Sequence, residues 1–454
     1  ARSIEVTVKG RYHVEPRFKP RLFFSPKAPT TTFRTKRQCA WHYGCRFATK
    51  KSTTMKINTG KGYISLAALL AIWSVSAVTS LPGLAISPIL GDMNSIFPKA
   101  SDLEIQMLTS LPSLLIIPFM LLSGHLSAKR GKLPLLATGL LIFFISGVAC
   151  FIAKSIATLI IASCTLGIGA GIIVPLSTGL VVDYFTGAKR VNQLGYSSAI
   201  NNLTLVAATA LTGYVADINW HLSFLVYLLP GISLLLCLAL RNEEPAPEPK
   251  HSDQYKQTTI NRRHLAVLTI FYFVITYISL VVTFDTAFLF EKYHISQHLA
   301  GISISLFFLA IMLPGLFLNK IITVTRSYTN VLSLLVLTAG LVLLSLFKSP
   351  TLLIAGVILT GLGYGVMQPL IYDKAAIIAP PKLATKALSV VMAANYTAII
   401  LCPFIIGAAR KIFASHSEQF GFILNASMAA VVTLIAFIGK KDFALGLDNS
   451  YYDK

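Results

Sequence analysis

The feature that most constrains this chain is a series of long apolar runs without charge. Residues 133–153 contain no charged side chain, and neither do residues 155–182. A helix needs about 20 apolar residues to cross the hydrocarbon core of a bilayer, so runs of this length predict membrane-spanning helices. Only 13% of the 454 residues are charged, against about 25% in soluble globular proteins. Part of the surface is therefore expected to face lipid.

Twelve apolar segments follow Met55, and a hydrophilic linker divides them into two sets of six. The expected spans cover residues 63–90, 105–126, 133–153, 155–182, 193–216, 219–240, 265–290, 299–319, 328–347, 350–372, 386–409 and 418–439. Three prolines and several charges mark the linker, residues 241–264. We therefore predict an all-α integral membrane protein with twelve transmembrane helices. Its two six-helix bundles would cover residues 55–240 and 265–440, followed by a cytoplasmic tail over residues 441–454.

Residues 1–54 form a separate basic segment, with thirteen Lys and Arg residues against two acidic ones. The segment shows no helical period, and the first methionine is Met55. Three interpretations stay open: a disordered extension, an organelle transit peptide, or a stretch upstream of a translation start at Met55, which we favour. Cys39, His42 and Cys45 lie close together here, but three ligands without a fourth make a weak zinc signal. We expect no metal and no cofactor.

The net charge of +21 fits a membrane topology better than nucleic-acid binding. If the amino terminus is cytoplasmic, fifteen Lys and Arg residues fall in cytoplasmic loops and six in the opposite loops. Positive residues collect on the cytoplasmic side of membrane proteins. We therefore expect a multi-pass protein of the plasma membrane with both termini cytoplasmic. Its partner would be the lipid bilayer rather than nucleic acid, and we expect a monomer.

An internal repeat is the most specific signal in the sequence. Residues 167–176 and 361–370 both follow the pattern G-x-G-x-G-x-x-x-P-L, and they are 194 residues apart. The same offset pairs Asn201 with Asn395. Small residues let helices approach closely in lipid, and proline permits bending. We predict that the repeated residues pack helices together: Gly167, Gly169, Gly171, Pro175, Gly361, Gly363, Gly365 and Pro369.

The loop after the second segment, residues 124–132, reads G-H-L-S-A-K-R-G-K and resembles the G-x-L-a-D-r-x-G-r-k loop of the major facilitator superfamily. Ala128 replaces the acid of that motif. The resemblance implies two bundles related by a pseudo-twofold axis, which rock around a central site. It also implies a cytoplasmic gate, in which Asp183 pairs with Lys129 or Arg130 or is simply solvated. The gate candidates are Gly124, Lys129, Arg130, Gly131, Lys132, Asp183 and Arg190.

Polar and aromatic residues within the spans are candidates for the wall of a substrate cavity. Asn201 and Asn395 occupy equivalent positions in the two repeats, and their amides offer both donors and acceptors. The further candidates are Trp73, Ser76, Asn202, Tyr272, Tyr277, Gln368 and Tyr396. An aromatic, uncharged cavity would suit an amphipathic or apolar solute. The alternative for these residues is packing and hydrogen bonding between helices.

Asp285 lies within the seventh predicted span, where an ionisable residue indicates function. It is a candidate for binding a coupling proton or cation, and the alternative is a residue at the outer mouth in contact with water. Ser163 occupies a position where drug–proton antiporters of the resembled family often carry an arginine. The missing arginine argues against proton antiport.

These features favour a secondary active transporter of a small organic solute, of the efflux type and working by alternating access. An uncoupled facilitator or importer is the alternative within transport. A transporter-like sensor or scaffold and a membrane-embedded enzyme are alternatives of other classes. The sequence has neither an H-E-x-x-H motif nor a P-loop, so we expect no enzymatic activity and no ATP-driven pump.

Overall fold

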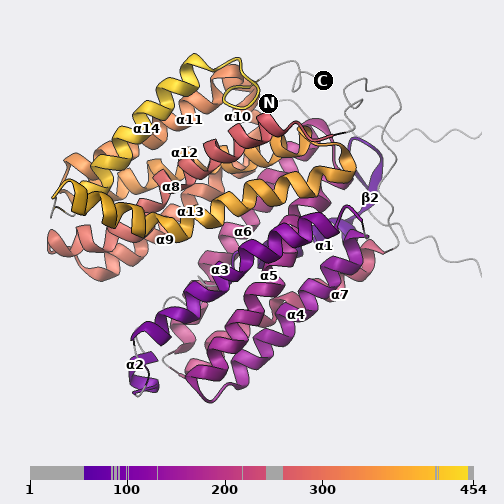
Figure 1. The fold of residues 1–454 in the computed structure, drawn as a ribbon, viewed down its shortest axis with the longest axis horizontal. Coiled ribbons are helices and arrows are strands. Elements are labelled where there is room, and N and C mark those ends of the chain that lie inside the picture. Colours follow the sequence, from indigo (N-terminus) through magenta and orange to yellow (C-terminus); the bar gives the residue numbers. More distant parts are fainter. Residues whose placement is uncertain are drawn as a thin grey trace, which may run out of the picture. The chain divides into compact units, whose positions relative to one another are not determined.

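The computed structural model describes residues 56–447, apart from residues 83–84, 86–88, 90–92, 99, 101, 130, 217, 242–258, 415–416 and 418. The basic segment 1–54, most of the linker and the last residues of the predicted tail lie outside the described residues. We refer to residues 56–240 as the first half and to residues 262–447 as the second half. Both halves are almost entirely helical (Figure 1).

The elements follow one another along the chain in a simple order. The first half contains β1 (Lys56–Asn58), β2 (Tyr63–Ser65), α1 (Leu66–Val78), α2 (Met93–Ile96), α3 (Asp102–Leu126), α4 (Lys132–Ile152), α5 (Ile156–Tyr184), α6 (Gly187–Ala216), the 3-10 helix η2 (Trp220–Leu228) and α7 (Leu229–Leu240). The second half contains α8 (Arg262–Lys292), α9 (Gln297–Leu316), α10 (Leu318–Thr325), η4 (Arg326–Tyr328), α11 (Thr329–Leu346), α12 (Pro350–Ile377), η5 (Pro381–Leu383), α13 (Ala384–Ile412) and α14 (Phe420–Ile438).

The helices confirm a polytopic membrane protein. Among the described residues, ten helical stretches are long and apolar enough to span a bilayer. Two shorter apolar stretches, Leu66–Val78 and Ser110–Leu126, bring the number to the predicted twelve. The first predicted span, residues 63–90, is too long, because α1 ends at Val78. Pro82 follows closely, and proline cannot continue a helix without losing a backbone hydrogen bond.

Several helices continue beyond the predicted spans into charged sequence. The prediction placed Arg190 and Lys374 in loops, but α6 begins at Gly187 and α12 runs to Ile377. Both charged side chains are buried and have partners within the protein, Arg190 with Asp373 and Lys374 with two backbone carbonyls. A charge satisfied in this way does not need to end a membrane helix at the lipid boundary.

A short antiparallel hairpin, β1 with β2, precedes α1 and was not predicted. Gly60 occupies its turn with a φ of 87°, a left-handed conformation that favours glycine. Asn58 Oδ1 accepts a hydrogen bond of 2.8 Å from Gly60 N and closes the turn. The hairpin carries Lys61, whose Nζ donates to Asp183 O at the end of α5 (3.5 Å). It therefore ties the start of the described chain to the end of the molecule where α5 ends.

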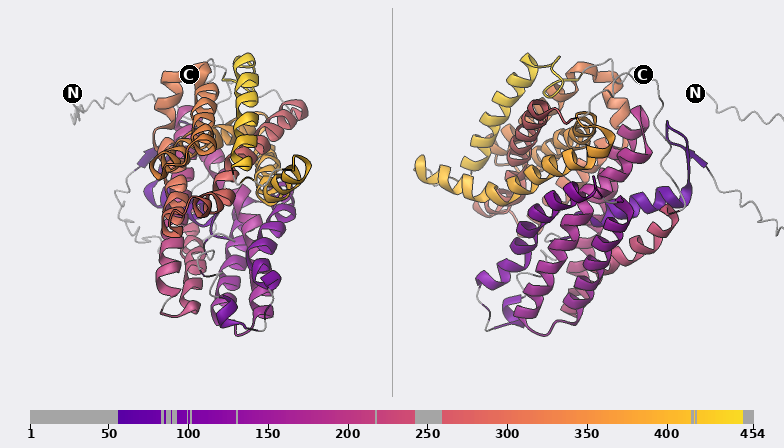
Figure 2. Two further views of the ribbon diagram at one scale, coloured as in Figure 1. Left: turned by 90° about the vertical axis from the view of Figure 1, so that its left-hand side faces the viewer. Right: turned by 45° about the vertical axis from the view of Figure 1, so that its right-hand side comes forward.

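Most buried apolar side chains form one large cluster within each half. The first-half cluster also includes Met392 and Ala393 of α13, and the second-half cluster includes Val182 of α5. The indigo-to-magenta helices accordingly lie together, as do the salmon-to-yellow ones (Figures 1 and 2). Contacts between the halves come mainly from α13 with α3 and α5, and from α6 with α9 and α12.

The repeated glycines lie where helices cross, and the two halves make equivalent contacts. A Cβ atom at Gly167 would lie 2.5 Å from Pro112 O in α3, and one at Gly361 would lie 2.7 Å from Phe307 O in α9. The other glycines of the repeats also face backbone atoms of a neighbouring helix: Gly169, Gly171, Gly363 and Gly365. The repeated prolines, Pro175 and Pro369, are buried within α5 and α12. Any side chain in place of these glycines would force the helices apart.

Candidate functional site

A cavity lies where α1, α5 and α6 of the first half face α12 and α13 of the second half. Its lining residues are Ser76, Thr79, Ser80, Val174, Ser177, Thr178, Leu194, Ser197, Ser198, Asn201, Gln368, Tyr372, Met392, Asn395 and Tyr396. The cavity volume is about 70 Å³, several times the ~10–15 Å³ that one water molecule needs. In this state of the protein the cavity has room for a small group of atoms only.

The sequence repeat explains which side chains meet at this cavity. Four pairs of lining residues are 194 residues apart in the chain: Val174 with Gln368, Thr178 with Tyr372, Ser198 with Met392, and Asn201 with Asn395. The members of each pair come from equivalent helices, either α5 with α12 or α6 with α13. The cavity therefore lies where corresponding faces of the two repeats meet.

The cavity wall is polar but carries no charged side chain. The first half contributes mainly hydroxyl groups, and two of them, Ser76 Oγ and Ser177 Oγ, lie 3.0 Å apart. Within the described chain, Asn201 Oδ1 and Ser197 Oγ are buried and have no hydrogen-bond partner. An unsatisfied buried polar atom costs about 1–3 kcal/mol, so these atoms favour a ligand with hydrogen-bond donors. With hydroxyl and amide side chains making up most of its lining, the wall is more polar than the aromatic, weakly polar cavity predicted from the sequence.

A hydrogen-bond network fixes the second-half wall of the cavity. Tyr272 Oη lies 2.9 Å from Tyr372 Oη and 3.4 Å from Tyr364 Oη. Tyr364 Oη donates to Asn395 Oδ1 (3.3 Å), and Gln368 Nε2 donates to Tyr372 Oη (3.4 Å). Tyr364, Gln368 and Tyr372 are spaced four residues apart on α12 and share one face of it. The network holds the phenol and amide groups in defined positions around the cavity.

Five of the predicted cavity residues lie in the lining: Ser76, Asn201, Gln368, Asn395 and Tyr396. Gln368 also connects the halves, because its Oε1 accepts a hydrogen bond of 3.1 Å from Ser198 Oγ. A ligand between the halves would compete for this contact or extend it.

The other four predicted cavity residues lie outside the lining. Trp73 Nε1 donates to Gln193 Oε1 (2.9 Å), and Asn202 Nδ2 donates to a backbone carbonyl of its own helix (2.8 Å). Tyr272 lies behind the wall and positions Tyr372, while Tyr277 is buried in the second-half core. The polar groups of Trp73, Asn202 and Tyr272 bond within the protein, as the packing interpretation predicts, whereas Tyr277 Oη is buried without a hydrogen-bond partner among the described residues.

Sequence reasoning missed Ser177, Ser198 and Tyr372 as cavity residues. Two signals point to Tyr372: it follows Gln368 by one helical turn, and it lies 194 residues after Thr178. The first signal applies to any residue four positions from a lining residue, so the second is the more specific. Nothing in the sequence distinguishes Ser177 from other serines within the spans.

Asp285 does not line the cavity and is 7% exposed. One of its carboxylate oxygens lies 3.2 Å from Arg410 Nη2 of α13. Gly421 of α14 packs against the same carboxylate, because a Cβ there would overlap it. Asp285 therefore joins α8, α13 and α14 within the second half.

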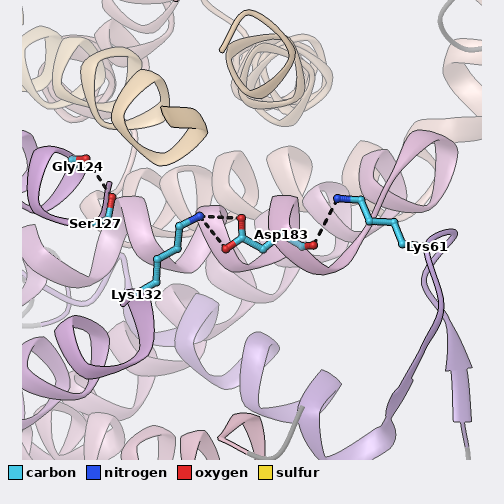
Figure 3. Close-up of polar contacts among 5 residues, drawn as sticks. All are labelled: Lys61, Gly124, Ser127, Lys132 and Asp183. Carbon is cyan, nitrogen blue, oxygen red and sulfur yellow. Dashed lines mark hydrogen bonds and ion pairs between the residues drawn. The ribbon is translucent and has the colours of Figure 1, made fainter. Parts of the chain in front are cut away.

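Several predicted gate residues lie at the end of the molecule where α5 ends and α4 and α6 begin. Lys132 Nζ lies 2.7 Å and 2.6 Å from the carboxylate oxygens of Asp183 (Figure 3). Asp183 thus pairs with Lys132 instead of Lys129, and Arg130 lies outside the described residues. Lys132 is the first residue of α4, which packs directly against α5, whereas Lys129 lies in the preceding turn.

Two equivalent close contacts join the halves at this same end. A Cβ atom at Gly124 of α3 would overlap Ser389 of α13, and Gly195 of α6 lies equally tightly against Gly315 of α9. Gly195 and Ser389 are 194 residues apart, so the second contact repeats the first with the halves exchanged. Gly131 is the N-cap of α4 and lies near Pro134 of its own half.

A buried ion pair also joins the halves. Arg190 Nε lies 2.6 Å from Asp373 Oδ1, and the two side chains are 4% and 0% exposed. Arg190 belongs to α6 and Asp373 to α12. Sequence reasoning missed Asp373 because the predicted span ended at residue 372. No local sequence pattern identifies the partner of Arg190 when the two residues are 183 positions apart in the chain.

The sequence model of the protein family described as Major Facilitator Superfamily matches this chain in two overlapping stretches, residues 64–403 and residues 265–445. A search of curated proteins gave no match. No group of three or more His, Cys, Asp and Glu side chains in the described residues could hold a metal ion.

Three solved structures show a similar fold. They are the proton:xylose symporter XylE bound to 6-bromo-6-deoxy-D-glucose (TM-score 0.65, 14% identity, 82% of this chain and 95% of that one), the human organic anion transporter MFSD10 (0.63, 15%, 81% and 97%) and FucP in the outward conformation (0.64, 13%, 82% and 97%). At these identities the likeness concerns the fold alone.

Proposed function

Because the chain belongs to the major facilitator superfamily, we propose that it carries a small, uncharged, polar organic solute across the membrane by alternating access. The observation that carries this proposal is the uncharged cavity on which equivalent residues of the two repeats converge. Asn201 Oδ1 can accept a hydrogen bond and Ser197 Oγ can donate or accept one, and a hydroxyl or amide group of a solute would supply both kinds of partner. A charged solute would find no counter-charge in this wall.

The two halves act as two six-helix bundles related by a pseudo-twofold axis. Three observations support this arrangement: the separate apolar cores, the equivalent glycine contacts, and the lining pairs at a constant offset of 194 residues. In transporters built from repeats, the halves rock around a central site. Here α5 with α6 and α12 with α13 would form the moving walls.

The described state is closed at the end where Gly124 meets Ser389 and Arg190 meets Asp373. Alternating access requires this end to open, and the ion pair between α6 and α12 to break, before a solute can pass. We assign this end to the cytoplasm, in line with the positive-inside rule. The start of the described chain, through Lys61, and its end near Lys374 both lie there. With this assignment we retain the proposal of a plasma-membrane monomer with both termini cytoplasmic.

The direction and coupling of transport form the finer part of the proposal. The sequence favours an efflux-type transporter, and we retain export as the working direction. A second candidate, an uncoupled facilitator or importer, is favoured because the cavity lining contains no acidic or basic residue. Asp285 is the remaining coupling candidate, and it would act through Arg410 rather than on the solute directly.

Flux into proteoliposomes, measured with and without a pH gradient, tests these possibilities. Proton coupling predicts flux that depends on the gradient and loses this dependence in Asp285→Asn. The matched control is Glu291→Gln, an exposed acid on the same helix. Flux that is indifferent to the gradient and to Asp285→Asn would establish the facilitator. No flux for neutral hydroxylated or amide solutes, in a folded protein, would refute transport of this solute class, and no flux for any solute would favour a sensor.

A further inference from the structure

The chain does not simply end after its last helix. Beyond α14, residues 440–447 turn back beside α10 (Figure 1). We call this segment the C-terminal strap. Backbone hydrogen bonds close its turn, from Gly446 N to Asp442 O (2.8 Å) and from Leu447 N to Lys440 O (3.4 Å). A Cβ atom at Gly446 would overlap Lys440 O, so this tight turn requires glycine.

Side chains of the second half anchor the C-terminal strap. Lys374 of α12 is 2% exposed, and its Nζ donates to Ala444 O (3.3 Å) and to Gly446 O. Asn330 of α11 donates from Nδ2 to Leu445 O at 2.7 Å. A lysine buried to this extent needs compensating partners, and in the described chain the carbonyls of the strap supply them. The strap is therefore held to the second half by specific hydrogen bonds.

The last described residue of the strap shares an apolar cluster with a residue of the first half. Leu447 is 2% exposed and belongs to a small apolar cluster with Val191, Leu318, Ile322, Val366 and Leu370. Val191 belongs to α6 and follows Arg190, while the other four residues belong to α10 and α12. Val366, Leu370 and Lys374 are spaced four residues apart, so one face of α12 holds both the apolar cluster and the anchor of the strap.

We propose that the C-terminal strap is a conformational lock, which holds the halves together at this end through the apolar cluster that Leu447 shares with Val191. Since Arg190 and Asp373 are the neighbours of Val191 and Lys374 in the chain, the lock lies beside the buried ion pair. When α6 moves away from α12, Val191 leaves the cluster and Leu447 loses part of its apolar cover. The strap thus favours the state closed at this end without touching the solute cavity.

This inference rests on the proposed function only in requiring two states of the halves. The test uses the full chain with its native cysteines replaced and one cysteine placed in the cavity, at Thr178. Its alkylation by a membrane-impermeant maleimide is measured separately from each face of the membrane. Leu447→Ala and Leu447→Asp remove the apolar contact, Lys374→Met removes the anchor, and Lys441→Ala is the control, because Lys441 is an exposed residue of the same segment.

Leu447→Asp and Lys374→Met are expected to raise the alkylation rate from the face of the strap by about tenfold, as the loss of one buried apolar or charged contact implies. Leu447→Ala should give a smaller rise in the same direction, and it serves where the stronger variants fail to fold. Lys441→Ala should leave the rate unchanged. Folded Leu447 variants with the parent rate would overturn the lock, whatever solute the protein carries. A strap effect in a protein that transports nothing would uphold the lock and refute the transport proposal.

Discussion

Replacing Asp373 with asparagine leaves the Arg190 guanidinium buried without its counter-charge. The two side chains are 0% and 4% exposed and their charged atoms lie 2.6 Å apart, so water does little to screen the pair. Removing one partner of a buried pair costs about 3–5 kcal/mol. The cost falls on the state described here, because Arg190 regains water when α6 and α12 separate. At about 1.4 kcal/mol per factor of ten, Asp373→Asn should shift the equilibrium toward opening at this end by about 100-fold or more.

Alkylation of a cavity cysteine from each membrane face measures this shift, and thermal unfolding in detergent reports any general loss of stability. The double variant Arg190→Gln with Asp373→Asn removes both charges, so it should recover part of what each single variant loses. A double-mutant cycle then gives the coupling free energy of the pair. An alkylation rate equal to the parent's in Asp373→Asn, or losses that simply add in the double variant, would show that the pair does not hold the halves together.

Three further predictions concern packing, surface charge and the cavity. Gly167→Ala should lower the free energy of unfolding by about 1–3 kcal/mol, because its Cβ meets a backbone carbonyl of α3. Gly301→Ala, in open space, should change it by less than ~1 kcal/mol; equal melting temperatures for both variants would contradict the packing role. Lys132→Ala should lower the free energy of unfolding by at most about 1 kcal/mol, and high salt should remove this loss, because the side chains of Lys132 and Asp183 are partly exposed (15% and 22%). A large loss that does not depend on salt would show that this ion pair is structural. Tyr372→Phe removes a hydroxyl of the cavity wall and should raise the KM for the transported solute about two- to tenfold. Tyr214→Phe, at an exposed tyrosine, should not, and an unchanged KM in Tyr372→Phe would exclude that hydroxyl from the site.

The internal repeat made part of the cavity predictable from the sequence. Asn201 and Asn395 both line it, because residues that are 194 positions apart in the chain occupy equivalent positions in the two halves. Tyr272 shows where composition fails. It has the aromatic and polar character of a lining residue, yet it lies behind the wall. In a membrane helix the lipid-facing and protein-facing sides are both largely apolar, so periodicity does not reveal which side turns to the cavity.

Helix ends and long-range partners were less predictable for a physical reason. Hydropathy ends a span at the first charged residues, whereas α6 and α12 continue through Arg190 and Lys374 because those charges are satisfied inside the protein. The choice of Asp373 as the partner of Arg190 depends on how the halves meet, which no local pattern contains. Lys132 and Asp183 pair for a similar reason, since α4 lies directly against α5.

The contact of Gly195 with Gly315 brings two bare stretches of backbone together. Neither glycine has a side chain that adds apolar contact or that must rearrange when the two helices separate. In the proposed transport cycle, the groups around this junction that help to hold this end closed include Arg190, Asp373 and Leu447. Changes at those positions can retune how fast the protein turns over while the solute-binding wall stays intact. Affinity and speed are therefore free to evolve separately in a molecule built this way.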